Sequence, residues 1–171
     1  MAAKPFSSRE RYAQFLQVQY RFHRDVAALF DHEELNRLLP GLVGRQRLNA
    51  VIQDLSDLGQ ALPQNLDAPV FAPGAAVDLA TALGWLYVEE GSNLGAAFLL
   101  KAAAALELNA DFGARHLAPH VQGRALSWKA FSAQLDAVPL DDTAKGRAAE
   151  AARAAFLTVH GYVQTHCEIH V

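Results

Sequence analysis

The stretch GWLYVEEGSNLGAAFL, residues 84–99, is mostly apolar and carries glycines at positions 91 and 95. It shows no period-two alternation, so we expect it to lie in a long helix over about residues 75–106. Gly91 and Gly95 are one helical turn apart and therefore share a face. Each glycine weakens a helix by roughly 1 kcal/mol relative to alanine. The pattern predicts a kink or a locally irregular backbone between them.

Two interpretations of these glycines remain open. A flat ligand can approach a backbone that carries no side chains, with Leu94 and Phe98 as apolar walls. Alternatively, the small residues let a neighbouring helix pack closely, and spacing alone favours this second interpretation. The residues around the glycines must decide between them.

The rest of the chain extends the helical pattern, and we expect one all-α domain over residues 1–171. Ser7 with Glu10 predicts a capping box for a helix that ends near Phe30. In that helix Gln19 and His23 share one ridge among apolar positions, so both are expected to point inward or into a cleft. Further helices are expected over about residues 31–39, 44–58, 127–138 and 142–163, opened by Asp31, Ser127 and Asp142 or Thr143. The last helix is expected to bury Ala148, Ala152, Phe156, Val159 and Val163.

Composition excludes several classes of function. A net charge of −3 argues against a non-specific nucleic-acid binder. The single cysteine, Cys167, excludes an internal disulfide framework and a four-cysteine zinc site. The seven histidines are scattered, and we predict no metal site built from them. The N-terminus lacks the apolar region of a signal peptide, and the richest apolar stretch, residues 94–100, is far shorter than the roughly 20 residues that cross a bilayer. We therefore expect a cytoplasmic protein that binds neither nucleic acid nor membrane.

Residues 84–99 resemble the distal-helix signature of bacterial heme oxygenases. The later segment FGARHLA, residues 112–118, is similar to the one that follows in the branch used for iron acquisition from heme. Residues 5–19 and 53–59 fit two other helices of that family. The resemblance runs from about Lys4 to the last helix, and it implies a helical bundle in which heme lies against a kinked distal helix.

The resemblance implies oxidative cleavage of heme, as both substrate and cofactor, to biliverdin, CO and ferrous iron. Electrons would come from a ferredoxin or a reductase. The positions implied to contact heme are Tyr87, Gly91, Ser92, Leu94, Gly95 and Phe98. The family's distal polar network resembles Gln19, His23 and Arg47 here, joined by His116, and such groups can organise water that delivers protons. On spacing alone, His23 is more simply an ordinary core histidine.

The resemblance does not cover the family's proximal helix, which lies on the side of the heme that carries the iron ligand. In the family the iron ligand is a histidine on a helix ahead of a Pro-Phe pair, and here only residues 1–4 precede Pro5-Phe6. No ligating histidine is identified. Three alternatives stay open: a shortened form of an ordinary heme oxygenase, a short relative that binds heme weakly or differently, and a scaffold that binds none. A non-catalytic heme-binding or regulatory protein is thus the competing function. Without that helix, apolar surface is left on the faces carrying Phe15, Phe22 and Phe156, and it favours a homodimer or another partner.

Overall fold

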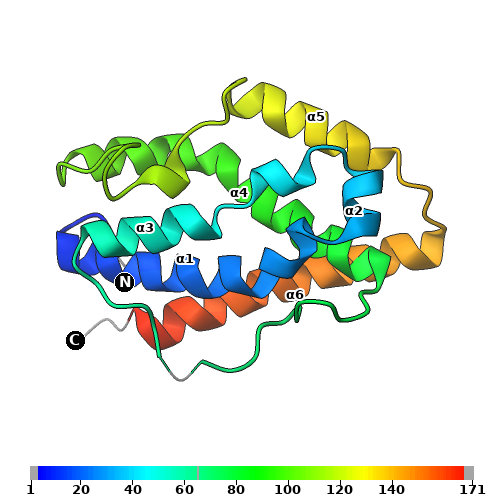
Figure 1. The fold of residues 1–171 in the computed structure, drawn as a ribbon, viewed down its shortest axis with the longest axis horizontal. Coiled ribbons are helices and arrows are strands. Elements are labelled where there is room, and N and C mark those ends of the chain that lie inside the picture. Colours follow the sequence, from blue (N-terminus) through cyan, green and yellow to red (C-terminus); the bar gives the residue numbers. More distant parts are fainter. Residues whose placement is uncertain (1–3, 65, 168–171) are drawn as a thin grey trace.

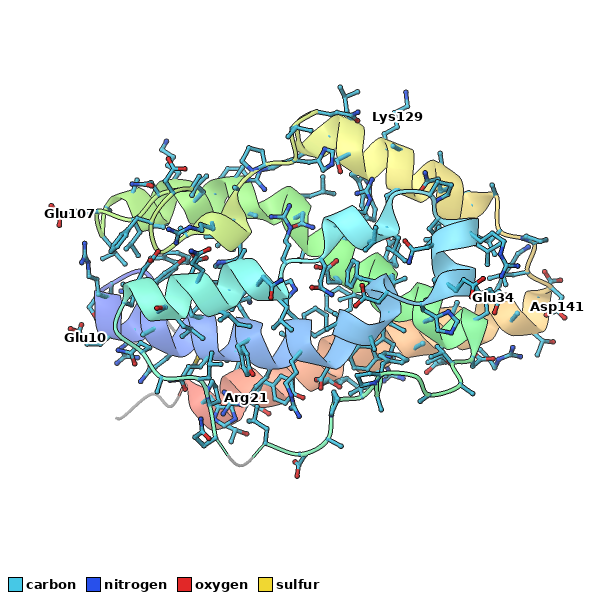
Figure 2. All side chains as sticks on the ribbon, viewed as in Figure 1. Glu10, Arg21, Glu34, Glu107, Lys129 and Asp141 are labelled. Carbon is cyan, nitrogen blue, oxygen red and sulfur yellow. The ribbon has the colours of Figure 1, made fainter. Side chains whose placement is uncertain are left out.

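The computed structural model describes residues 4–64 and 66–167, and these residues form a helical bundle without a β-strand (Figure 1). The prediction of an all-α fold is confirmed. Its elements in chain order are α1 (Arg9–Phe30), α2 (Glu33–Leu38), the 3₁₀ helix η1 (Leu42–Arg45), α3 (Leu48–Asp57), α4 (Leu79–Ala104), the 3₁₀ helix η2 (Arg115–Leu117), α5 (Arg124–Asp136) and α6 (Asp142–His166). Charged side chains such as Glu107, Lys129 and Asp141 extend from the rim of the bundle into solvent (Figure 2).

Side-chain caps fix the starts of three helices. Ser8 caps α1 by accepting the Arg11 backbone N–H, so the predicted cap at Ser7 is wrong by one residue. Asp78 caps α4 in the same way, and Asp141 caps α6. A short polar side chain in extended backbone satisfies a first-turn N–H that has no partner within the helix.

Three predicted helix starts are wrong. Asp31 is the C-cap of α1, and α2 begins after His32. The region predicted as helical from position 44 is split into η1 and α3. Ser127 lies buried inside α5, which starts three residues earlier after Gly123. Gly123 has φ +85°, a conformation that glycine adopts without strain, and it turns the chain into the helix.

Helices α4 and α6 pack closely where small residues face each other. A methyl group added at Gly84 would overlap the backbone carbonyl of Ala148 and lie 2.9 Å from the Ala151 Cβ. Along α6 the buried residues are accordingly Ala151 and Ala155, whereas Phe156 is 62% exposed. The predicted inward row is therefore wrong at Phe156 and Val163, whereas its members Ala148, Ala152 and Val159 are half-buried, and Ala152 and Val159 pack against the core.

Two apolar clusters fill the bundle on either side of its middle. One is built around Phe22, Leu29, Trp85, Leu86 and Phe131. The other is built around Tyr12, Leu16, Val51, Leu55 and Leu108. No helix within the described part of the chain combines the length and apolarity needed to cross a membrane.

Candidate functional site

Helix α4 remains α-helical through both glycines of the signature. Of the two predicted alternatives, a locally irregular backbone is absent, whereas the α4 ribbon changes direction near its middle in Figure 1, as a kink does. Here the Ser92 hydroxyl donates a hydrogen bond to the Glu89 carbonyl at 2.6 Å, a contact that bends helices without breaking them.

Helix α4 presents an open apolar face that begins at Tyr87 and continues through its C-terminal half. Phe98 is 80% exposed, Tyr87 46% and Leu94 43%. A Cβ added at Gly95 would meet nothing within 4 Å, whereas one added at Gly91 would lie 3.5 Å from the Trp128 ring of α5. Exposed apolar side chains around an uncovered backbone are typical of a binding surface.

Five of the six positions predicted to contact heme are exposed on α4, and Gly91 is half-buried. We call the surface formed by Tyr87, Ser92, Leu94, Gly95 and Phe98 the α4 face.

A histidine and a carboxylate lie together beneath this helix. The Nδ1 of His23, on α1, lies 3.3 Å from Oε1 of Glu89, and the two side chains are 4% and 0% exposed. Within the described residues, neither these two atoms nor Oε2 of Glu89 has a hydrogen-bond partner. The sequence analysis missed Glu89. The signal for it was present, because two adjacent glutamates in an apolar helical stretch are unusual.

A second buried histidine pairs with a carboxylate in a denser arrangement. His116 Nδ1 lies 2.8 Å from Asp54 Oδ2. Asp54 also accepts the backbone N–H groups of Arg115 at 2.9 Å and His116 at 3.0 Å. Burial lowers the pKa of His116 even though Asp54 opposes that shift.

Arg47 connects α3 to the segment that carries His116. Its guanidinium donates to the backbone carbonyls of His116 at 2.8 Å and Ala118 at 3.0 Å. His23 and Arg47 both act electrostatically on the His116 ring, so these three predicted residues gather in one region. Gln19 is half-buried one turn before His23 and makes no hydrogen bond to these three side chains.

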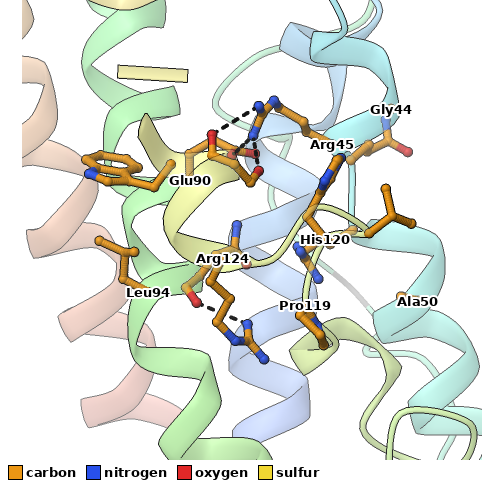
Figure 3. Close-up of a pocket in the computed structure, with 14 residues that line it drawn as sticks. Gly44, Arg45, Ala50, Glu90, Leu94, Pro119, His120 and Arg124 are labelled. Atoms are coloured by element: carbon orange, nitrogen blue, oxygen red, sulfur yellow. Dashed lines mark hydrogen bonds and ion pairs between the residues drawn. The ribbon is translucent and has the colours of Figure 1, made fainter. Parts of the chain in front are cut away.

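A pocket of about 300 Å³ adjoins the α4 face and shares Leu94 with it (Figure 3). Arg45 and Arg47, from the junction of η1 and α3, and Arg124, from the start of α5, converge on it. Arg45 donates to Glu90 at 2.7 Å and to the Ser127 hydroxyl at 2.9 Å. Burial, reinforced by the charge of Glu89 and opposed by Arg45, raises the pKa of Glu90 to about 7.

No group of three or more histidine, cysteine, aspartate or glutamate side chains gathers as a metal site in the described ranges. The chemistry that the arrangement offers is therefore a flat apolar surface on α4 with buried proton-exchanging groups behind it. An apolar macrocycle with an attached reacting centre fits such a surface.

Comparison with known proteins agrees with this architecture. The family model described as heme oxygenase matches residues 2–165, and the chain belongs to the heme oxygenase family. The chain is 50% identical over 153 residues to heme oxygenase PigA of Pseudomonas aeruginosa, covering 90% of this chain and 76% of that protein. A crystal structure of the NO- and CO-bound heme oxygenase of Neisseria meningitidis superposes with a TM-score of 0.89 at 41% identity, covering 98% of this chain and 81% of the other.

Proposed function

We propose that this protein is a heme oxygenase that binds heme on the α4 face and cleaves it oxidatively to biliverdin, CO and ferrous iron. The observation that carries the proposal is the uncovered backbone at Gly95 between exposed apolar side chains, beside a buried histidine–carboxylate pair. When bound, heme supplies both the iron that activates O₂ and the macrocycle that is cleaved.

The apolar residues of the α4 face bind the macrocycle and exclude water. Phe98 would bury the largest additional apolar surface against a bound ligand, because most of its side chain is exposed without one. Burying a phenylalanine side chain fully is worth about 2 kcal/mol. Leu94 and Tyr87 add smaller contributions because they are already half covered. Gly91, Ser92 and Gly95 let the backbone approach the ring plane.

The buried polar residues hold and move protons. We assign this role to His23, with Gln19 one turn away on the same helix and Arg47 as a fixed positive charge. His116 keeps Arg47 in place, since its carbonyl accepts the Arg47 hydrogen bond while its ring is anchored on Asp54. Water between buried polar groups can complete such a path.

We assign none of the histidines in the described residues as iron ligand. His23 and His116 direct Nδ1 to carboxylates in the interior. His160 on α6 is exposed, and nothing in its contacts directs it to the α4 face. We therefore propose the α4 face as the heme-binding surface and assign no axial ligand of the iron among the described residues.

Hemin titration of this chain, followed by addition of reductant and O₂, tests the function. We expect a Soret band that decays to a biliverdin spectrum, and exogenous imidazole should sharpen the band if only the axial ligand is lacking. Stable binding without decay, with and without imidazole, indicates a non-catalytic heme-binding protein instead. A Soret band that stays at the position of free hemin throughout the titration contradicts the proposal.

We further infer a ferredoxin or a reductase as electron donor, a cytoplasmic location and self-association through exposed apolar side chains. Of the side chains expected on this surface, Phe156 is 62% exposed, next to Leu157 at 60%, and Phe15 is half-buried, whereas the expectation is wrong for Phe22, which is buried in the core. Sedimentation velocity over a range of concentrations tests the dimer, and a monomer at the highest concentration contradicts it. Biliverdin formation with purified ferredoxin or reductase as the only electron source tests the donor.

A further inference from the structure

The buried contact between His23 and Glu89 has a feature that ordinary core packing does not explain. A carboxylate with no exposed surface and no hydrogen-bond donor costs several kcal/mol to bury. Glu89 is 0% exposed, and its one close polar neighbour among the described residues is the His23 ring. An apolar residue of similar volume would stabilise the fold at least as well.

The place of this pair along α4 links it to the α4 face. Glu89 precedes Gly91 by two residues and Gly95 by six, which is about 9 Å along a helix axis. The Ser92 hydroxyl, on the α4 face, bonds the Glu89 carbonyl. At 100° per residue Glu89 points away from Gly95 and Phe98, so the pair lies on the inner side of α4, behind the α4 face.

The contact also selects between the two nitrogens of the imidazole. Nδ1 of His23 faces the carboxylate. Nε2 is therefore the ring nitrogen left to exchange a proton with other groups. A carboxylate on one imidazole nitrogen fixes the ring's tautomer and orientation and stabilises the imidazolium. His116 also turns its Nδ1 to a buried carboxylate, and there the 2.8 Å distance to Asp54 is a hydrogen bond.

We propose that Glu89 is a positioning residue for His23: its carboxylate holds the imidazole through Nδ1 and leaves Nε2 to exchange protons with the α4 face. In each exchange the Nε2 proton passes to an acceptor on that face, and His23 becomes neutral with Nδ1–H on Glu89. Solvent water returns a proton to Nε2. Other titratable or charged groups near the pair are Arg47 and His116, and Glu90 with its partner Arg45. The role of His23 in proton transfer rests on the proposed function. The orientation of its ring by Glu89 does not depend on that function.

Nitrogen NMR of the histidine rings in the heme-free protein tests the orientation directly. We expect His23 to carry a proton on Nδ1 in the wild type and to change largely to the Nε2–H form in Glu89→Ala. Glu89→Gln should keep Nδ1–H, because its amide oxygen still accepts a hydrogen bond. Glu90→Gln is the matched control, a neighbouring buried glutamate whose partner is Arg45, and it should leave the His23 tautomer unchanged. An unchanged tautomer in Glu89→Ala overturns the proposal.

The rate of heme cleavage separates the effect of the His23 ring orientation from the effect of the Glu89 charge. We expect heme cleavage to fall at least tenfold in Glu89→Ala and about threefold to tenfold in Glu89→Gln, with heme affinity within threefold of wild type because Glu89 is not on the α4 face. If Glu89→Ala does not fold, Glu89→Gln still decides, since wild-type turnover in that variant contradicts a role for the charge. If the wild type cleaves no heme while the tautomer behaves as expected, the proposed function fails and the assignment of Glu89 to His23 stands.

Discussion

The two halves of α4 use glycine for opposite purposes. In the N-terminal half, residues 82–90 are buried apart from Tyr87, and Gly84 lets α6 approach to the backbone. In the C-terminal half, most residues are exposed or half-buried, and nothing covers Gly95. Gly91 is intermediate, because the Trp128 ring lies against it. The same residue type in one helix thus serves packing at one end and an open surface at the other.

Gly84→Ala should have the largest effect on folding. The added methyl group overlaps the Ala148 carbonyl, so α4 and α6 must move apart, at a cost of about 3 kcal/mol. Urea unfolding followed by circular dichroism measures this loss. Gly146→Ala, at a helical position with nothing within 4 Å, is the matched control and should stabilise by about 0.5–1 kcal/mol. Equal stability of the two variants would show that the contact between the helices is looser than described.

The pH dependence of stability reports on Glu90, at the boundary between the two halves. Its pKa is raised from 4.5 to about 7, so the folded state binds more protons than the unfolded state between these values. The contribution of Glu90 is therefore fully present below pH 4.5 and is lost as pH rises to 7, by up to about 3 kcal/mol. Glu90→Gln should remove this part of the decline in the free energy of unfolding. Glu150→Gln, at an exposed glutamate, should leave the decline as in the wild type.

Gly95→Leu tests the open half. The leucine side chain enters free space and replaces a helical glycine, so the fold should gain about 0.5–1 kcal/mol. Hemin affinity should fall at least tenfold, about 1.4 kcal/mol, because the side chain occupies the α4 face. Absorbance titration measures the hemin affinity. Gly95→Ala is the control that distinguishes the effect of losing the glycine from the effect of the bulky leucine side chain. Unchanged hemin binding in Gly95→Leu would place the ligand elsewhere.

Phe98→Ala should have the smallest effect. Its side chain is 80% exposed, so stability should stay within about 0.5 kcal/mol of wild type. Hemin affinity should fall about threefold to tenfold with the loss of an apolar wall. Leu126→Ala, which removes a 63% exposed side chain on α5, should leave hemin affinity unchanged.

Much of this architecture follows from local pattern. The helix that ends at Phe30 and the long helix carrying the two glycines were predicted within a few residues. The start of α5 was missed, since Gly123 rather than a polar side chain opens it. The buried row of α6 was missed because amphipathic spacing favours the large Phe156, whereas contact with Gly84 requires alanine.

The sequence alone determined the helical class, the family likeness and the positions of Gly91, Gly95 and His23. It could not determine that Glu89 lies against His23 while its neighbour Glu90 bonds Arg45, or that Asp54 anchors His116. Helical periodicity assigns each residue to a face, but its partner comes from another helix far along the chain. Only the packing of α1, α3, α5 and α6 around α4 decided which carboxylates lie against histidines, which glycine is covered and which remains open.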